Sequence, residues 1–218
     1  MTDAATVKET NGAFWTRVRS ALGALRPVRD QQRSPAYGQA AIARSIGIKP
    51  KLGARIEEEL VHGWHNAAAR KVSLSLLVIE IDRMTDYFNA YGKAATDDCV
   101  LATMRAVTDA LPRSGDTCLR LGRATFVIVL PDLPVLMARA SAAKIAEAIR
   151  KLSLAHKESH AGIVTVSMGL AVTNPHGGYD KKFFEAAAEA LKKAQRKGLS
   201  RIEAVDLRPA QERKRKAA

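Results

Sequence analysis

The sequence is poor in cysteine and in aromatic residues, and its apolar runs are short. Its two cysteines, Cys99 and Cys118, lack a C-x-x-C spacing and lie in apolar stretches, where a free thiol behaves as a small buried hydrophobe. No apolar run approaches the roughly 20 residues of a membrane-spanning helix, and residues 1–30 lack the apolar region of a signal peptide. We therefore expect a protein of the reducing cytoplasm.

Charge is abundant and mainly positive. The 218 residues include 35 Lys and Arg against 22 Asp and Glu, a net charge of +13, which raises nucleic acid and anionic membranes as partners. Residues 1–35 carry six basic and three acidic residues, and residues 206–218 carry five and two. Between these ends no basic stripe with interleaved aromatic residues occurs, so we do not expect nucleic-acid binding. The 47% hydrophobic content suffices for one globular domain with tails.

The first 50 residues are expected to lie outside this domain. Residues 11–26 place large apolar side chains on one face of a basic amphipathic helix, which ends at Pro27. The helix would pack against the domain or a sister subunit of a homodimer, or make a peripheral contact with a membrane. Residues 27–50 are expected to form a linker. The predicted division is helix and linker (1–50), domain (51–206) and basic tail (207–218).

The domain alternates helical and strand patterns. Helical spacing of apolar residues predicts helices at 52–70, 84–91, 97–111, 135–152 and 181–197. Short Val-, Ile- and Leu-rich runs predict strands at 73–81, 117–123, 125–130, 164–172 and 201–205. The second and third strands meet at a tight hairpin. This order predicts an α+β fold, a mainly antiparallel sheet with helices on its faces that elaborates the ferredoxin-like unit.

Four segments resemble the GGDEF (diguanylate cyclase) family. They read LLVIEID (76–82) running on to Tyr91-Gly92, RLGRATF (120–126), VTVSMG (164–169) and AEALKKAQRKG (188–198), and together they cover roughly residues 52–205. The resemblance implies a nucleotidyl cyclase-like fold. It also implies an ancestral activity that joins two GTP molecules into cyclic di-GMP, each GTP presented by one of two domains.

The metal-binding positions of that family are altered here. Glu80 stands where the family has Asp, while Ile81, whose backbone carbonyl would serve, and Asp82 agree with the pattern. Hard cations need such oxygens to neutralise charge during phosphoryl transfer. We expect no more than weak Mg²⁺ binding at Glu80, with no metal site or other cofactor. His156 and His160 are four residues apart but lack the H-E-x-x-H order, so they predict no zinc site.

The signature hairpin has lost its carboxylates. The positions that match Gly-Gly-Asp-Glu are Gly122, Arg123, Ala124 and Thr125. Thr125 offers an uncharged hydroxyl, and Arg123 adds a side chain where glycine lets the backbone approach a phosphate. No catalytic residue is therefore predicted at this site.

The guanine-binding positions are also changed. Phe88 corresponds to the Asn that reads guanine in the family. Asp97 corresponds to the Asp that also contacts guanine there, and this residue is unchanged. Thr85 corresponds to the family's lysine near the phosphates. Together these replacements indicate a pocket that no longer supports turnover.

One element of the family is intact. Arg113 and Asp116 have the R-x-x-D spacing, five residues before Gly122, of the product-binding motif. A planar guanidinium can bond guanine O6 and N7 or a phosphate, and a carboxylate can accept from the N–H edge of guanine. The alternative is an exposed turn in which both charges are solvated.

Three functions follow from these observations. The leading hypothesis is a catalytically inactive GGDEF domain that binds cyclic di-GMP at Arg113 and Asp116 and signals to a protein partner. The second is a nucleotide-independent protein-interaction module. The third is an atypical diguanylate cyclase with residual activity from Glu80 and Asp82.

Overall fold

The computed structural model describes residues 52–111 and 113–209. The chain divides after Pro50 into two units, and all described residues belong to the second. The predicted N-terminal helix and linker, and the tail beyond residue 209, lie outside the described residues. Within the described part of the chain, none of the helices is long and apolar enough to cross a bilayer.

Four helices and five strands make up the described residues. The helices are α3 (Leu52–Arg70), α4 (Met84–Ala110), α5 (Val135–Lys151) and α6 (Lys182–Arg196). The strands are β1 (Leu74–Ile81), β2 (Thr117–Arg120), β3 (Thr125–Pro131), β4 (Val166–Thr173) and β5 (Ile202–Asp206).

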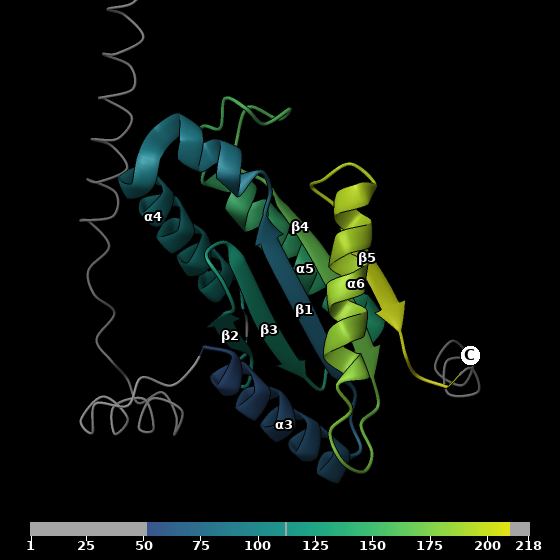
Figure 1. The fold of residues 1–218 in the computed structure, drawn as a ribbon. Helices are drawn as coiled ribbons and strands as arrows, with labels where there is room; N and C mark the ends of the chain where they lie inside the picture. The colour runs from purple at the N-terminus through teal and green to yellow at the C-terminus, as the bar shows by residue number, and fades with distance from the viewer. Residues whose placement is uncertain (1–51, 112, 210–218) are drawn as a thin grey trace, which may run out of the picture. The chain divides into compact units, whose positions relative to one another are not determined.

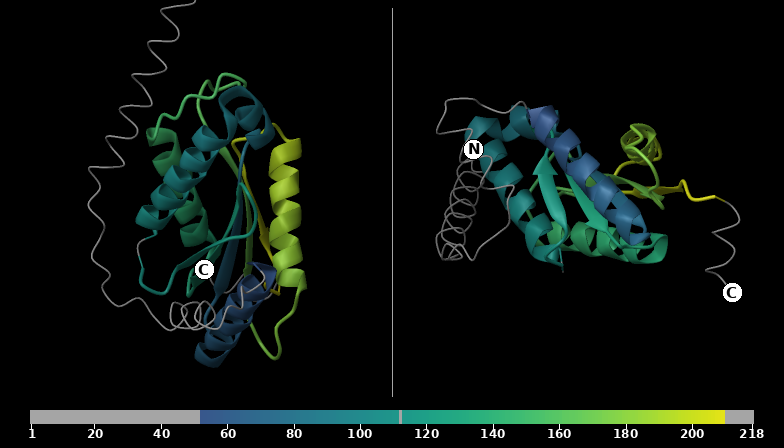
Figure 2. Two further views of the ribbon diagram at one scale, coloured as in Figure 1. Left: turned by 60° about the vertical axis from the view of Figure 1, so that its left-hand side comes forward. Right: turned by 90° about the horizontal axis from the view of Figure 1, so that it is seen from below.

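The strands form one sheet in the order β2-β3-β1-β4-β5 (Figure 1). All neighbouring pairs are antiparallel except β4 and β5, which run parallel. Helices α3 and α6 cover one face of the sheet, and α4 and α5 lie on the other (Figures 1 and 2). The predicted α+β class with a mainly antiparallel sheet is therefore confirmed.

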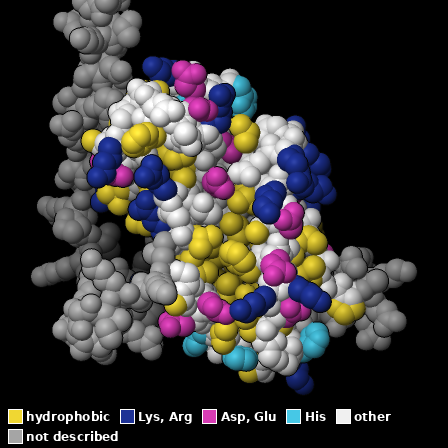
Figure 3. All heavy atoms as spheres, in the orientation of Figure 1, with side chains coloured by type: hydrophobic (Ala, Val, Ile, Leu, Met, Phe, Trp, Pro, Cys, Tyr) yellow, Lys and Arg dark blue, Asp and Glu magenta, His cyan; other side chains and the backbone are white. Residues whose placement is uncertain are grey.

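Strand β1 is central and buried on both faces, as its mainly apolar sequence predicts. Leu74, Leu76 and Val78 point toward α3 and α6, where they share a core cluster with Trp64 and Phe183. Because side chains alternate along a strand, Leu77 and Ile79 point toward α4 and α5. Hydrophobic side chains also reach the surface over the sheet between α3 and α6 (Figure 3).

Gly169 on β4 lets α6 approach the sheet closely. A Cβ atom built at this position would collide with the backbone of Ala187 and Leu191 on α6. Glycine is therefore required here by space rather than by backbone conformation.

Most boundaries lie within two residues of the sequence-based expectation, and two features differ by more. The helices predicted at 84–91 and 97–111 form the single run α4, which kinks at Gly92, where φ is 78°. Gly92 accommodates this left-handed φ because it lacks a Cβ atom. Strand β2 ends at Arg120 rather than at residue 123, since residues 121–124 form the hairpin turn.

Candidate functional site

Glu80 lies near the end of β1, between two hydroxyl-bearing residues. The sheet register pairs it with Thr125 on β3 and with Ser167 on β4. Directly paired residues project from the same face of a sheet, so the Glu80 carboxylate has a hydroxyl on each side. Glu80 is half-buried. The structure thus brings the predicted positions Glu80 and Thr125 together. Of the two side chains, only that of Glu80 is a carboxylate.

Asp82 serves the fold through its carboxylate. Thr165 donates to Oδ2 at 2.8 Å, Ser167 donates to Oδ1 at 2.6 Å, and the Ser200 backbone N–H donates to Oδ2 at 3.0 Å. The residue is only 4% exposed. These bonds tie the end of β1 to β4 and to the turn before β5. The oxygens of Asp82, one of the expected site residues, are thus occupied by protein donors.

Arg120 holds the hairpin turn. Its Nε donates to the Gly122 carbonyl at 2.8 Å, and its Nη2 donates to the Arg123 carbonyl at 2.9 Å. Ala124 is buried, and its carbonyl accepts the Ile81 N–H at 3.0 Å. The turn is therefore ordered without carboxylates. The sequence analysis assigned Arg120 no role. Its place next to the predicted turn was a signal, because an arginine carries five N–H donors that can bond the carbonyls of a turn.

Arg123 and Phe88 contact each other across the site. The guanidinium carbon of Arg123 lies 5.4 Å from the centroid of the Phe88 ring, within the range of a cation–π interaction. The β2–β3 turn and the start of α4 lie at the same end of the sheet (Figure 1). Two of the expected site positions, Arg123 and Phe88, therefore contact each other. Asp97, beyond the kink at Gly92, is exposed and has no hydrogen-bond or ion-pair partner among the described residues.

These residues do not fit a catalytic magnesium ion. Mg²⁺ favours carboxylate oxygens in octahedral geometry. Glu80 supplies the one available carboxylate, since Asp82 is occupied and Ala124 and Thr125 carry none. Across the described residues, no group of three or more His, Cys, Asp or Glu side chains is arranged to hold a metal.

The Arg113–Asp116 turn forms a separate feature. Arg113 Nη2 donates to Asp116 Oδ1 at 2.9 Å, and Nη1 donates to the Asp132 carbonyl at 3.2 Å. The Asp116 side chain is 1% exposed and that of Arg113 is 36% exposed. The alternative of two solvated charges is therefore wrong, because the side chains pair and one is buried.

This pair is incompletely satisfied. Arg113 Nε and Asp116 Oδ2 are both buried and lack a hydrogen-bond partner. Buried polar atoms without partners are uncommon in folded proteins. Strand β2, four residues long, separates this turn from Gly122 by about 13 Å, so the turn is not part of the site around Glu80.

Comparisons with known proteins agree with this architecture. The family described as "Diguanylate cyclase, GGDEF domain" matches residues 54–201, more than half of the chain. Diguanylate cyclase A of Treponema denticola is 28% identical over 144 residues, which cover 66% of this chain and 38% of that protein. Diguanylate cyclase DosC of Escherichia coli is 28% identical over 130 residues, covering 60% of this chain and 28% of that protein. The chain thus spans well under half the length of these relatives.

Solved structures share the fold. The GGDEF domain of DgcB from Caulobacter crescentus, in complex with c-di-GMP, has a TM-score of 0.61 at 20% identity and covers 69% of this chain and 88% of that one. Diguanylate cyclase SiaD of Pseudomonas aeruginosa, in complex with its activator SiaC, has a TM-score of 0.63 at 20% identity and covers 92% and 79%. From the family match and the shared sheet topology, this chain belongs to the GGDEF-domain family.

Proposed function

We propose that this chain is a cytoplasmic GGDEF domain that binds cyclic di-GMP and does not synthesise it. The observation that carries the proposal is the Arg113–Asp116 turn. Its guanidinium and carboxylate are already oriented by each other, yet Nε of one and Oδ2 of the other lack partners. Both atoms are buried, so they become available when the pair separates, and a ligand with acceptors and donors on adjacent edges would then satisfy them.

Guanine has this complementarity. Its O6 and N7 accept from a planar guanidinium, and its N–H edge donates to a carboxylate. Arg113 is the more accessible partner, so it makes the first contact. Asp116 then recognises guanine when Arg113 releases Oδ1. Binding in this way breaks the charge-assisted hydrogen bond between Arg113 and Asp116 and replaces it with several hydrogen bonds to guanine.

The absence of synthesis is supported by the composition of the other site. One carboxylate, Glu80, faces Thr125 where metal binding would require a second. The Arg123–Phe88 contact occupies the side of the site where a guanine base would be read. An atypical cyclase that depends on Glu80 and Asp82 is disfavoured because Asp82 is engaged by three protein donors.

A nucleotide-independent interaction module is the second candidate. Leu136 and Met137, on the first turn of α5, are 80% and 58% exposed. Large apolar side chains so open to water favour a protein partner. SiaD, a structural relative, is bound to an activator protein. A protein partner of this chain would cover the exposed Leu136 and Met137.

Calorimetric titration of cyclic di-GMP into the full chain tests the proposal. Arg113→Ala should weaken binding about ten- to a hundredfold, because it removes a charged, two-pronged contact. Asp116→Asn should also weaken it, since an amide has one acceptor oxygen and no charge. Arg150→Ala is the matched control, because Arg150 forms a similar i,i+3 pair with Glu147 on α5.

The same protein incubated with GTP and Mg²⁺ should form no cyclic di-GMP above background. Product that disappears in Glu80→Ala would establish the atypical cyclase. Absence of binding at high micromolar ligand, or equal binding by both turn variants and wild type, would leave the interaction module as the function.

A further inference from the structure

The outer edge of β5 has backbone groups that no other strand uses. β5 is the last strand of the sheet and pairs only with β4 among the described strands. The Met168 N–H donates to the Arg201 carbonyl, and the Leu207 N–H donates to the Val172 carbonyl, both at 2.8 Å. In a parallel pair, alternate residues bond the neighbour. The N–H and C=O groups of Ile202 and Ala204 consequently point away from β4.

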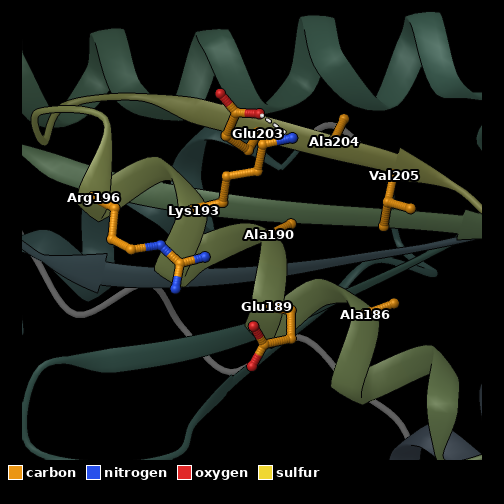
Figure 4. Close-up of a pocket in the computed structure, with 8 residues that line it drawn as sticks. All are labelled: Ala186, Glu189, Ala190, Lys193, Arg196, Glu203, Ala204 and Val205. Atoms are coloured by element: carbon orange, nitrogen blue, oxygen red, sulfur yellow. Dashed lines mark ion pairs between the residues drawn. The ribbon is translucent and has the colours of Figure 1, made fainter.

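A groove runs beside this edge, between β5 and α6 (Figure 4). Its volume is about 300 Å³. Small apolar residues form much of its wall: Ala186 and Ala190 on α6, Val205 on β5, and Ala204, which contributes its backbone because its side chain points to the opposite face of the sheet. An extended chain placed along β5 would direct alternate side chains into this groove.

The surroundings of the groove are basic. Glu203 is held by Lys197 at 2.8 Å and by Lys193 at 3.6 Å. Glu189 and Arg196 also line the groove, and Lys192 pairs with Glu189 at 2.8 Å. Four basic side chains (Lys192, Lys193, Arg196 and Lys197) therefore stand against two acidic ones (Glu189 and Glu203) around the groove. Basic side chains gather over this C-terminal end of α6 (Figure 3). Positive charge at the groove favours an acidic occupant.

The chain's own ends do not match this requirement. Residues 1–35 carry six basic against three acidic residues, and residues 206–218 carry five against two. Their excess of basic residues disfavours binding of either end beside the basic end of α6. The same argument opposes a second copy of this chain, whose net charge is +13.

We propose that β5 docks an extended acidic segment of another protein by strand addition, with alternate side chains in the groove against α6. Backbone hydrogen bonds to Ile202 and Ala204 provide affinity, and Arg196 selects acidic residues at one end. This interaction is independent of the nucleotide site, which lies on other elements.

A synthetic peptide of about eight residues that alternates valine with glutamate serves as the probe. Fluorescence anisotropy with the full chain should show saturable binding, and a valine–lysine peptide should not bind. Ala204→Pro removes an outward N–H while the bonds to β4 remain, and should weaken binding about tenfold or more. Ala204→Val is the matched control, because it retains the N–H and should bind within about twofold of wild type.

Charge is tested separately. Arg196→Glu should weaken binding about tenfold, whereas Lys144→Glu, the same charge change on exposed α5, should have little effect. Equal effects of the two variants, or no binding at about 1 mM peptide, would overturn the proposal. Neither Ala204→Pro nor Arg196→Glu should alter affinity for cyclic di-GMP.

Amide exchange of the free protein distinguishes the occupants. The amides of Ile202 and Ala204 should exchange rapidly alone and slow down with the peptide. Protection without peptide would overturn the proposal in favour of a tail of the chain or a second copy. Sedimentation would then separate these two, since only a second copy changes the mass.

Discussion

The Arg123 guanidinium lies over the Phe88 ring, 5.4 Å from its centroid. The resemblance to active cyclases implies a glycine at the first position and an asparagine at the second. Both replacements are larger, and they meet each other across the β2–β3 turn and α4. The result is a contact worth about 0.5–1 kcal/mol at an exposed position.

The pairing of Glu80 with Thr125 predicts how a restored carboxylate would behave. Thr125→Glu places two like charges on directly paired strand positions and should lower the free energy of unfolding by about 0.5–1 kcal/mol. Millimolar Mg²⁺ should raise the Tm of this variant by bridging the carboxylates. Thr125→Gln, which lacks the charge, is the control. An equal Mg²⁺ response of the wild-type protein would mean that Glu80 already holds the ion.

Asp82 and Glu80 should differ sharply in their contribution to stability. Asp82→Ala leaves the Thr165 and Ser167 hydroxyls and the Ser200 N–H without their acceptor, and should lower the free energy of unfolding by about 3 kcal/mol or more. Glu80→Ala should change it by less than about 1 kcal/mol. Urea denaturation measures both. Similar losses for the two variants would contradict the structural role assigned to Asp82.

Gly169 should not tolerate even one added methyl group. Gly169→Ala forces α6 away from β4 and should lower the free energy of unfolding by about 3 kcal/mol. Gly178→Ala is the matched control, because a Cβ at that position meets no atom within 4 Å. Thermal melts compare the two. Wild-type stability of Gly169→Ala would show that α6 does not pack as closely as described.

His156 should make the domain less stable in mild acid. Burial lowers the pKa of His156 below its ordinary value, opposed by its hydrogen bond to the Arg83 carbonyl and by Asp86 and Glu158. The unfolded chain therefore takes up a proton near pH 6.5 that the folded domain resists. Stability should be lost as the pH falls below about 6.5 and be unaffected by this group above it.

The measurement is the Tm at pH 7.5 and pH 5.5, conditions on either side of the ordinary histidine pKa of about 6.5. His160→Gln, which alters an exposed ring, should retain the wild-type difference. His156→Gln should reduce it. An unchanged difference in His156→Gln would assign the acid sensitivity to other groups.

The strand pattern was readable from the sequence because burial on both faces leaves a mainly apolar run with no polar alternation. Leu74–Ile81 is such a run, interrupted by Ser75 and Glu80, and it is the central strand. Helix α6 was equally clear, since its apolar residues recur at helical spacing. The sequence predicted two helices where the structure has the single kinked helix α4. A glycine such as Gly92 is equally typical of a kink within one helix and of a break between two.

The sequence predicted which residues form the candidate site but not how they contact one another. Matching residues to the family located Glu80, Thr125, Arg123 and Phe88, but not which of them touch. Arg123 and Phe88 meet because the sheet brings the β2–β3 turn beside α4, a relationship that residue spacing does not contain. The engagement of Asp82 likewise depends on Ser200, which comes from the far end of the domain.

The order of the strands has a consequence for synthesis on the ribosome. Strand β1 is made early, but its partner β4 is made late, since Leu74 pairs with Thr173. Until β4 emerges, β3 can cover one edge of β1 while the other remains open. During this interval an apolar strand has an unpaired edge, the condition that favours aggregation of nascent chains. A chain cut before Val166 would remain permanently in that state.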